Sequence, residues 1–318
     1  MPAPQRRPLG RSGLSIAPIA LGGNVFGWTV DTSTGFRILD AFASAGFNLI
    51  DTANTYSIWI SGHHGGESES LLGRWLQESG RRKEVLIATK VGMDMGPGGK
   101  GLSASHIRSS VDASLRRLGT DYIDLYQAHE DDPTTPLEET LGEFSALVDS
   151  GRVRAIGASN FGAARLEAAL KTCCEQGFHR YESLQPRYNL VDRNEYETSL
   201  DSVCRSHGLG VLPYASLAAG FLTGKYRGPA DAQKSPRGTR AVARLNERGL
   251  RILAALDEVA EHLATTPAVV AVAWLISRPN VSAPIASVTS VEQLAELLKA
   301  ATLSLDRSSI RLLDAASG

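Results

Sequence analysis

The chain has 318 residues, 42% of them hydrophobic and 21% charged, with a formal net charge of -1. This is the composition of a globular protein, and its near-neutral balance excludes a basic surface for nucleic acid and a polybasic membrane anchor. No apolar run approaches the roughly 20 residues that would span a bilayer, and no apolar segment of a secretory signal is visible. The cysteines form no paired motif. We therefore expect a cytoplasmic protein with reduced thiols and no nucleic-acid or membrane partner.

Short β-rich runs alternate with amphipathic helical patterns almost to the end of the chain. A two-strand hairpin is predicted first, at 8–17. Eight further strands follow, predicted at 19–21, 47–50, 84–89, 122–127, 152–159, 182–185, 208–214 and 281–286. Helices with apolar residues at three- and four-residue spacing are clearest at 34–46, 105–119 and 136–151. A last helix, capped by Asp306, is expected at 305–317.

Eight strand–helix units favour a (β/α)8 TIM barrel over an open doubly wound sheet, because this alternation is typical of parallel βαβ units. The hairpin at 8–17 is expected to plug the amino-terminal mouth of the barrel, with the final helix as an addition outside the repeat. No linker or internal repeat divides the sequence, so a single domain over 1–318 is predicted. The longest loops, 54–66 and 215–244, are expected to be functional or mobile.

Two motifs that suggest other ligands are not supported by their context. The segment 96–101, GPGGKG, satisfies the G-x-G-x-x-G pattern of dinucleotide-binding turns. Its glycines come several residues after the preceding strand, whereas that fingerprint requires a tight strand-to-helix turn. We interpret it as a βα loop. His63 and His64 lie in a glycine-rich loop without a third ligand at suitable spacing, so no metal site is predicted.

Four polar residues lie at or just after three consecutive predicted strands. Asp51 follows 47–50 and Tyr56 lies in the next loop. Lys90 ends the third strand, and His129 follows the fourth. The carboxyl ends of barrel strands converge on one face, so these four side chains are expected to meet there. Taken singly, each has another interpretation: a helix cap, a loop anchor, a solvated strand end or a core histidine.

Together the four residues predict a proton-donating site. An ammonium near a phenol is expected to lower the phenol pKa, which is about 10 in water. Asp51 would hold Lys90 charged and oriented. Tyr56 would then act as a general acid, and His129 would hydrogen-bond the same substrate oxygen. A proton donor without a nucleophile indicates carbonyl reduction by an external hydride, and therefore a nicotinamide cofactor.

The motifs around these residues resemble those of the aldo-keto reductases. The resemblance runs from about residue 8 to 315 and rests on GFNLIDTANTY, GGESESLLGRWL, LIATKVG, SLRRLGTDYIDLYQAH, GRVRAIGASNF, QPRYNL and VLPYASLAAGFLTGKY. It implies the barrel fold and NAD(P)H-dependent reduction of aldehydes or ketones. It also implies a catalytic tetrad of Asp51, Tyr56, Lys90 and His129.

The resemblance further implies contacts to NADPH. The residues expected to touch the cofactor are Ser159, Asn160, Gln185, Tyr214, Ser216, Leu217, Gly220, Lys225, Ala286, Ser287, Thr289 and Gln293. Ser159, Asn160 and Gln185 are expected to hydrogen-bond the nicotinamide carboxamide. The alternative is that Ser159 and Asn160 are turn residues and that Gln185 is a satisfied buried amide. Tyr214 is expected to stack on the ring, or to be a core tyrosine. The segment from Ala215 to Lys225 resembles the strap over the pyrophosphate.

The adenosine end departs from the family pattern. Thr289 stands where the family commonly has a basic residue for the ribose 2′-phosphate, and Leu297 where it usually has Asn. Gln293 is retained, and Thr289 and Ser290 lie at a predicted helix start, which favours an anion. NADPH is therefore expected, with NADH use possible.

The substrate is expected to be a small carbonyl compound in a pocket walled by Phe26, Trp28 and Trp59, with packing as the alternative for each. The acidic run 130–132 either favours polar or cationic substrates or is a solvated loop. Other functions stay open: a regulatory subunit of the potassium-channel β type, or an alcohol or sugar dehydrogenase. A lyase or isomerase without nicotinamide is a third class, which Tyr214 argues against. The natural substrate and the oligomeric state are left open.

Overall fold

The computed structural model describes residues 4–318, so the predicted domain, 1–318, begins three residues before the described part. Eight parallel strands form one sheet in the order β10-β3-β4-β5-β6-β7-β8-β9. They are β3 (Ala20–Gly22), β4 (Leu49–Asp51), β5 (Leu86–Val91), β6 (Ile123–Ala128), β7 (Val153–Ser159), β8 (Tyr181–Gln185), β9 (Gly210–Val211) and β10 (Ile285–Ala286). Ile285 N donates to Pro213 O at 2.8 Å, which closes the sheet. The predicted (β/α)8 barrel is confirmed.

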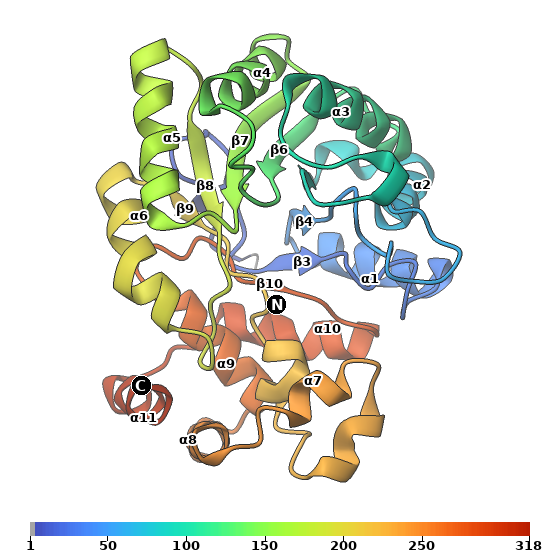
Figure 1. The fold of residues 1–318 in the computed structure, drawn as a ribbon. Coiled ribbons are helices and arrows are strands. Elements are labelled where there is room, and N and C mark those ends of the chain that lie inside the picture. The colour runs from blue at the N-terminus through green and yellow to red at the C-terminus, as the bar shows by residue number, and fades with distance from the viewer. Residues whose placement is uncertain (1–3) are drawn as a thin grey trace.

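Helices cover the outside of the strands (Figure 1). They are α1 (Thr32–Ser44), α2 (Glu67–Ser79), α3 (Ala104–Leu118), α4 (Leu137–Asp149), α5 (Ala163–Gln176), α6 (Asp201–His207), α7 (Gly238–Val242), α8 (Glu247–His262), α9 (Pro267–Ile276), α10 (Val291–Leu298) and α11 (Arg307–Ser317). Side chains of Asp31, Ser103 and Asp306 cap α1, α3 and α11. Within residues 4–318 no single helix is long and apolar enough to cross a membrane; α8 and α9 pass only as a pair bent by 94°.

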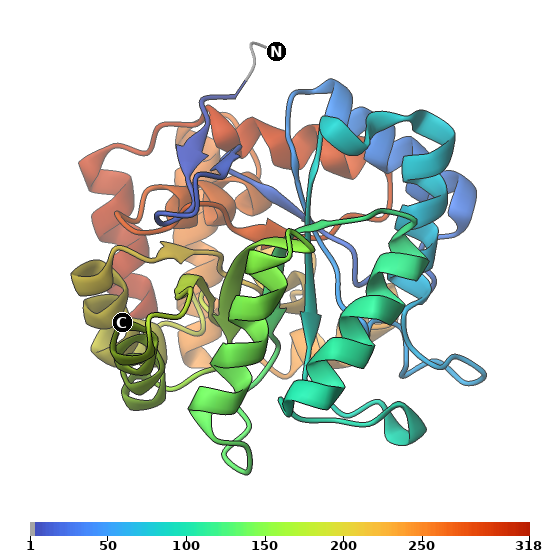
Figure 2. The same cartoon turned by 90° about the horizontal axis from the view of Figure 1, so that it is seen from above.

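The predicted N-terminal hairpin is present and lies across one end of the strands (Figure 2). Its strands, β1 (Arg7–Pro8) and β2 (Ser15–Ile16), pair antiparallel. Leu9 and Leu14 are buried in a small apolar cluster with barrel residues such as Leu125. The hairpin therefore plugs the barrel, as expected, and leaves the carboxyl ends of the strands for chemistry.

Two predicted strands are shorter than expected. The segment 208–214 forms only the two residues of β9, and 281–286 forms only the two of β10. Gly208 instead ends α6 as its C-cap, and Pro213 and Pro284 have no N–H for a strand ladder next to β9 and β10. Tyr214 therefore lies beyond the end of β9, joined to the loop after β8 by an isolated bridge.

Candidate active site

Asp51 and Lys90 form a buried ion pair inside the barrel. Lys90 Nζ lies 2.7 Å from Asp51 Oδ2, and the two side chains are 0% and 2% exposed. The pair forms because β4 and β5 are adjacent parallel strands and both residues face the barrel interior. Lys90 Nζ also donates to Thr52 O at 2.8 Å and to Tyr56 Oη at 2.9 Å. All three ammonium protons thus have acceptors.

Tyr56 reaches this pair from the loop after β4. Its hydroxyl donates to Asp51 Oδ2 at 3.2 Å. Burial, and then the Asp51 carboxylate, raise the pKa of the Tyr56 phenol well above its usual value. The expected lowering of this pKa is therefore wrong for this structure, because burial and the Asp51 carboxylate raise it. The phenol keeps its proton at neutral pH, which a proton donor requires.

His129 follows β6 and faces Tyr56, with 6.0 Å between the ring centroids and 71° between the ring planes. Burial, and then the charge of Lys90, hold the pKa of His129 well below its usual value. The imidazole is therefore neutral at neutral pH. Its Nδ1 is buried and has no hydrogen-bond partner among the described residues. A neutral ring of this kind can donate one hydrogen bond to an oxygen beside the phenol.

A cavity of about 1520 Å³ extends from these groups. Asp51, Tyr56 and His129 line it, whereas Lys90 lies behind Tyr56. Every residue expected to contact a cofactor lines the same cavity: Ser159, Asn160, Gln185, Tyr214, Ser216, Leu217, Gly220, Lys225, Ala286, Ser287, Thr289 and Gln293. The structure thus places the predicted proton-transfer residues and the predicted cofactor contacts at the same cavity.

Two amide side chains connect the groups at the inner end of the cavity. Asn160 has a left-handed backbone, with φ of 55°, which Asn adopts more readily than most residues. Its Nδ2 donates to His129 O at 2.9 Å, and its Oδ1 accepts from the Tyr214 hydroxyl at 2.7 Å. Gln185 Nε2 donates to Asp51 Oδ1 at 2.8 Å. Residues predicted for the cofactor are therefore hydrogen-bonded to residues predicted for catalysis.

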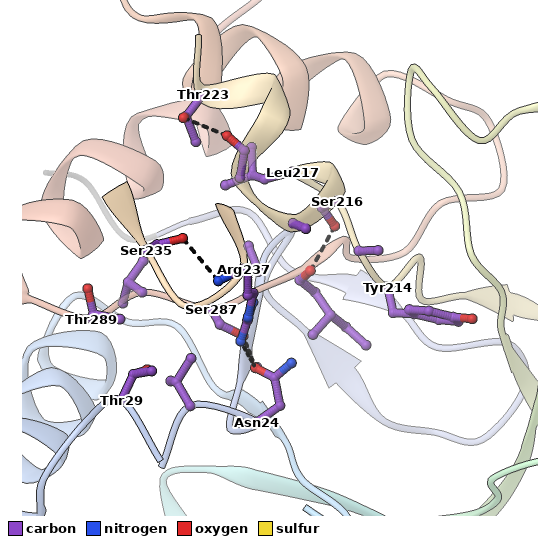
Figure 3. A pocket seen from close by; sticks show the side chains of 18 of the residues that line it. Asn24, Thr29, Tyr214, Ser216, Leu217, Thr223, Ser235, Arg237, Ser287 and Thr289 are labelled. Carbon is purple, nitrogen blue, oxygen red and sulfur yellow. Dashed lines mark hydrogen bonds between the residues drawn. The ribbon is translucent and has the colours of Figure 1, made fainter. Parts of the chain in front are cut away.

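The segment after β9 crosses the cavity as a strap (Figure 3). Ala215, Ala218 and Ala219 have φ angles of 56°, 48° and 60°, an unfavourable region for residues with a side chain. Such strain clusters at ligand-binding segments. Ser216 Oγ donates to Ile285 O at 2.8 Å and so fixes the strap to β10. The strap presents a strained backbone with small side chains to the cavity.

Asn24 and Arg237 line the cavity, although the sequence did not predict them as site residues. Asn24 Oδ1 accepts from Ser287 Oγ at 2.7 Å and from an Arg237 guanidinium nitrogen at 3.3 Å. Figure 3 shows the three side chains pointing toward one another. Arg237 also lies 5.0 Å from the centre of the Trp28 ring. Its loop, 215–244, is expected from the sequence to be functional or mobile, but no sequence signal separates Arg237 from Arg240 there.

The far end of the cavity lies at the start of α10. Thr289 donates through N and Oγ1 to Gln293 Oε1, at 3.0 and 3.2 Å. Ser290 caps the helix by accepting from Gln293 N. The lining of the cavity as a whole includes both positive and negative side chains; they include Lys234, Arg240, Arg244, Glu292 and Glu296. The cations therefore come from residues 234–244 instead of from position 289, and two of them, Lys234 and Arg244, are paired with Asp231 and Asp192.

Two of the three predicted substrate walls line the cavity. Trp28 and Trp59 pack edge to face with centroids 5.6 Å apart, and Trp59 lies 6.3 Å from the Tyr56 ring. The prediction for Phe26 is wrong: it is 1% exposed and belongs to the main core. The tight turn after β3 directs its ring toward Gly35 of α1 and away from the cavity.

The acidic run 130–132 is tied into its own loop. Asp131 Oδ1 accepts from Arg165 Nε at 2.8 Å. Asp132 accepts from the hydroxyls of Thr134 and Thr135 at 2.6 and 2.7 Å. Among the described residues, the cavity lining includes none of the three acidic side chains. Asp131 and Asp132 therefore stabilise the loop after β6, and their bonds show that they are not simply solvated.

A protonated phenol at the inner end of a long cavity suits an oxidoreductase that adds hydrogen to an oxygen-bearing carbon. Comparison with known proteins identifies the particular group. The chain belongs to the aldo/keto reductase family, whose family model matches residues 18–317.

Individual relatives support the same assignment. The chain is 38% identical to an uncharacterized oxidoreductase, YrpG, of Bacillus subtilis, over 96% of this chain and 94% of that protein. It is 33% identical to a probable voltage-gated potassium channel subunit beta of Arabidopsis thaliana, over 93% and 90%. It is 31% identical to L-glyceraldehyde 3-phosphate reductase of Escherichia coli K12, over 93% and 87%. The protein is thus an NAD(P)H-dependent oxidoreductase acting on carbonyl groups.

Proposed function

We propose that the protein reduces aldehydes or ketones to alcohols with NADPH, and that Tyr56 is the general acid. The observation that carries this proposal is the position of the Tyr56 hydroxyl, 2.9 Å from Lys90 Nζ in the wall of the cavity. When bound, the reduced nicotinamide supplies a hydride to the carbonyl carbon. The proton for the carbonyl oxygen then comes from the protein.

The four polar residues divide the proton chemistry among them. Tyr56 donates its proton to the substrate oxygen, and the Lys90 ammonium stabilises the phenolate that remains. Asp51 keeps Lys90 charged and in place. His129, neutral and close to the phenol, donates a hydrogen bond to the same oxygen. The reverse steps use the same groups, so oxidation of an alcohol or sugar is the second direction that the site supports.

The cavity fits a dinucleotide in size and in chemistry. Its volume of about 1520 Å³ exceeds the roughly 300–1,000 Å³ of pockets for drug-sized ligands. Ser159, Asn160 and Gln185 would hold the carboxamide, and Tyr214 would support the ring. The strap amides, with Lys225 and the newly recognised Arg237, would hold the pyrophosphate.

NADPH is proposed over NADH, and its binding is the first test. The start of α10 and the cations among residues 234–244 favour binding of a 2′-phosphate, while the carboxylates of Glu292 and Glu296 oppose it. We expect NADPH to bind about tenfold more tightly than NADH, the equivalent of one charge-assisted contact. Fluorescence titration of the two cofactors measures the ratio. Thr289→Arg should increase the ratio of NADPH affinity to NADH affinity. Equal affinities of the wild type for the two cofactors would contradict the proposed NADPH preference.

The pH dependence of kcat follows from two pKa directions. The pKa of His129 is lowered by burial, so its neutral form persists below its usual value of about 6.5. The pKa of Tyr56 is raised, so the phenol stays protonated beyond about 10. Both groups keep their working states between about pH 6 and 8, so neither His129 nor Tyr56 should produce a step in kcat at saturating substrates there. A step in kcat near pH 6.5 would show that His129 titrates normally.

The function itself is tested by loss of NADPH absorbance with a panel of aldehydes and ketones. Glyceraldehyde 3-phosphate belongs in the panel because a relative carries that substrate in its name. Reduction of panel members to alcohols is the expected result. Cofactor binding without any turnover would instead favour a regulatory subunit like the potassium-channel relatives. Conversion of substrate without nicotinamide would favour a lyase or isomerase.

A further inference from the structure

Gln127 of β6 is a buried amide to which the proposed chemistry gives no role. Its side chain is 0% exposed. It pairs in register with Lys90 of β5, so both side chains face the barrel interior. Its Oε1 accepts a hydrogen bond from Gln185 Nε2 at 3.4 Å. Gln127 therefore touches the residue proposed to bind the nicotinamide carboxamide, from the side away from the cavity.

The orientation of the Gln185 amide follows from its two acceptors. Its Nε2 donates to Asp51 Oδ1 at 2.8 Å and to Gln127 Oε1 at 3.4 Å. An ionised carboxylate only accepts hydrogen bonds, so the nitrogen of Gln185 must face Asp51. This orientation leaves Oε1 of Gln185 for the cavity, which Gln185 lines.

A missing side chain on β7 permits the contact between Gln127 and Gln185. β7 lies between β6 and β8, and Gly157 pairs with Gln127 on one side and with Ser183 on the other. A Cβ at position 157 would lie 2.3 Å from Ser183 Oγ and 3.3 Å from Gln127 Cγ. Gly157 thus opens the path along which the amide of Gln127 crosses a strand.

We propose that Gln127 is a positioning residue that orients Gln185 toward the nicotinamide carboxamide. With Nε2 held by Asp51 and Gln127, Oε1 of Gln185 accepts from the carboxamide N–H. A half-turn of the Gln185 amide would set its oxygen against the Asp51 carboxylate, which is repulsive, and would lose the bond to Gln127 Oε1. The same bonds connect cofactor recognition to the Asp51–Lys90 pair. The inference rests on the proposed function and assigns it a further residue.

A purely structural role for Gln127 is disfavoured by its own nitrogen. Nε2 of Gln127 is buried and has no hydrogen-bond partner among the described residues. Such a group destabilises the fold, because it loses its bonds to water without replacement. We therefore expect Gln127→Leu to unfold at the same urea concentration as the wild type or at a higher one. A loss of function in that variant would then come from the site.

The test is a double-mutant cycle read by equilibrium binding. NADPH and its reduced 3-acetylpyridine analogue, whose acetyl group has no N–H, are titrated against wild type, Gln127→Leu, Gln185→Leu and the double variant. Wild type should bind NADPH about tenfold more tightly than the analogue. This ratio should fall to about threefold in Gln127→Leu and to about one in Gln185→Leu. The double variant should match Gln185→Leu, because Gln127 acts through Gln185.

Ser183→Ala is the matched control, since its buried hydroxyl also lacks a partner among the described residues. It should leave the cofactor ratio and turnover unchanged. A wild-type ratio in Gln127→Leu, or independent effects in the double variant, would overturn the inference. If Gln127→Leu does not fold, Gln127→Met repeats the test. If the binding ratios follow the expected pattern but the wild type reduces no carbonyl compound, the proposed function alone is overturned. If the wild type binds neither NADPH nor the analogue, the inference and the proposed function are both overturned.

Discussion

Replacing Tyr56 with Phe is expected to lower kcat for carbonyl reduction by about a thousandfold, within the range known for general acids. The substitution removes the hydroxyl that bonds to both Lys90 and Asp51, at 2.9 and 3.2 Å. Nothing else in the tetrad can supply the proton as readily, because His129 is neutral and Lys90 lies behind the phenol. NADPH affinity should stay within about twofold of wild type, since the lost interaction belongs to the transition state. Steady-state kinetics and fluorescence titration give the two values.

Tyr126→Phe is a matched control for this substitution. Tyr126 is fully buried on β6, and its hydroxyl has no hydrogen-bond partner among the described residues. Removing that hydroxyl should leave kcat unchanged, which separates the loss of a proton donor from the loss of any buried hydroxyl. A kcat of Tyr56→Phe within about tenfold of wild type would show that the proton comes from another group.

Lys90→Met is expected to destabilise the protein by about 3–5 kcal/mol and to abolish turnover. Lys90 and Asp51 are 0% and 2% exposed, so removal of the ammonium leaves a carboxylate buried without its counter-charge. Tyr56 and Gln185 still donate to that carboxylate, but neither carries charge. Urea denaturation followed by circular dichroism measures the free energy of unfolding.

Two further variants test the physical reason for the Lys90 prediction. Lys171→Met breaks an exposed pair with Glu175, whose side chains are 74% and 58% exposed, and should change stability by less than about 0.5 kcal/mol. Adding Asp51→Asn to Lys90→Met removes the unpaired charge and should restore much of the lost stability. If Lys90→Met were as stable as Lys171→Met, the ion pair would contribute nothing to the fold.

The sequence was most informative where chain topology alone fixes position. Asp51, Lys90 and His129 lie at the ends of three successive parallel strands, and parallel order brings such ends together regardless of side-chain packing. The sequence predicts all eight strands, and the largest errors in length are in the two strands next to Pro213 and Pro284.

Features that depend on packing between distant segments could not be predicted in the same way. The direction in which Phe26 points depends on the turn after β3 and on the space beside Gly35. Arg237 enters the cavity because its loop folds back toward Asn24, more than two hundred positions earlier in the chain. The raised pKa of Tyr56 depends on how deeply the phenol is buried and on how close it lies to the Asp51 carboxylate. Each of these features depends on packing between distant segments, which the local sequence pattern does not encode.

The most direct test of the account is a single-turnover experiment on wild type and Tyr56→Phe, each loaded with NADPH and mixed with an aldehyde that the wild type reduces. This measurement isolates hydride and proton transfer from product release. We expect the wild type to consume one equivalent of NADPH per alcohol formed, and Tyr56→Phe to do so with a rate constant about a thousandfold lower. Equal rates in the two proteins would contradict the assignment of Tyr56 as the proton donor.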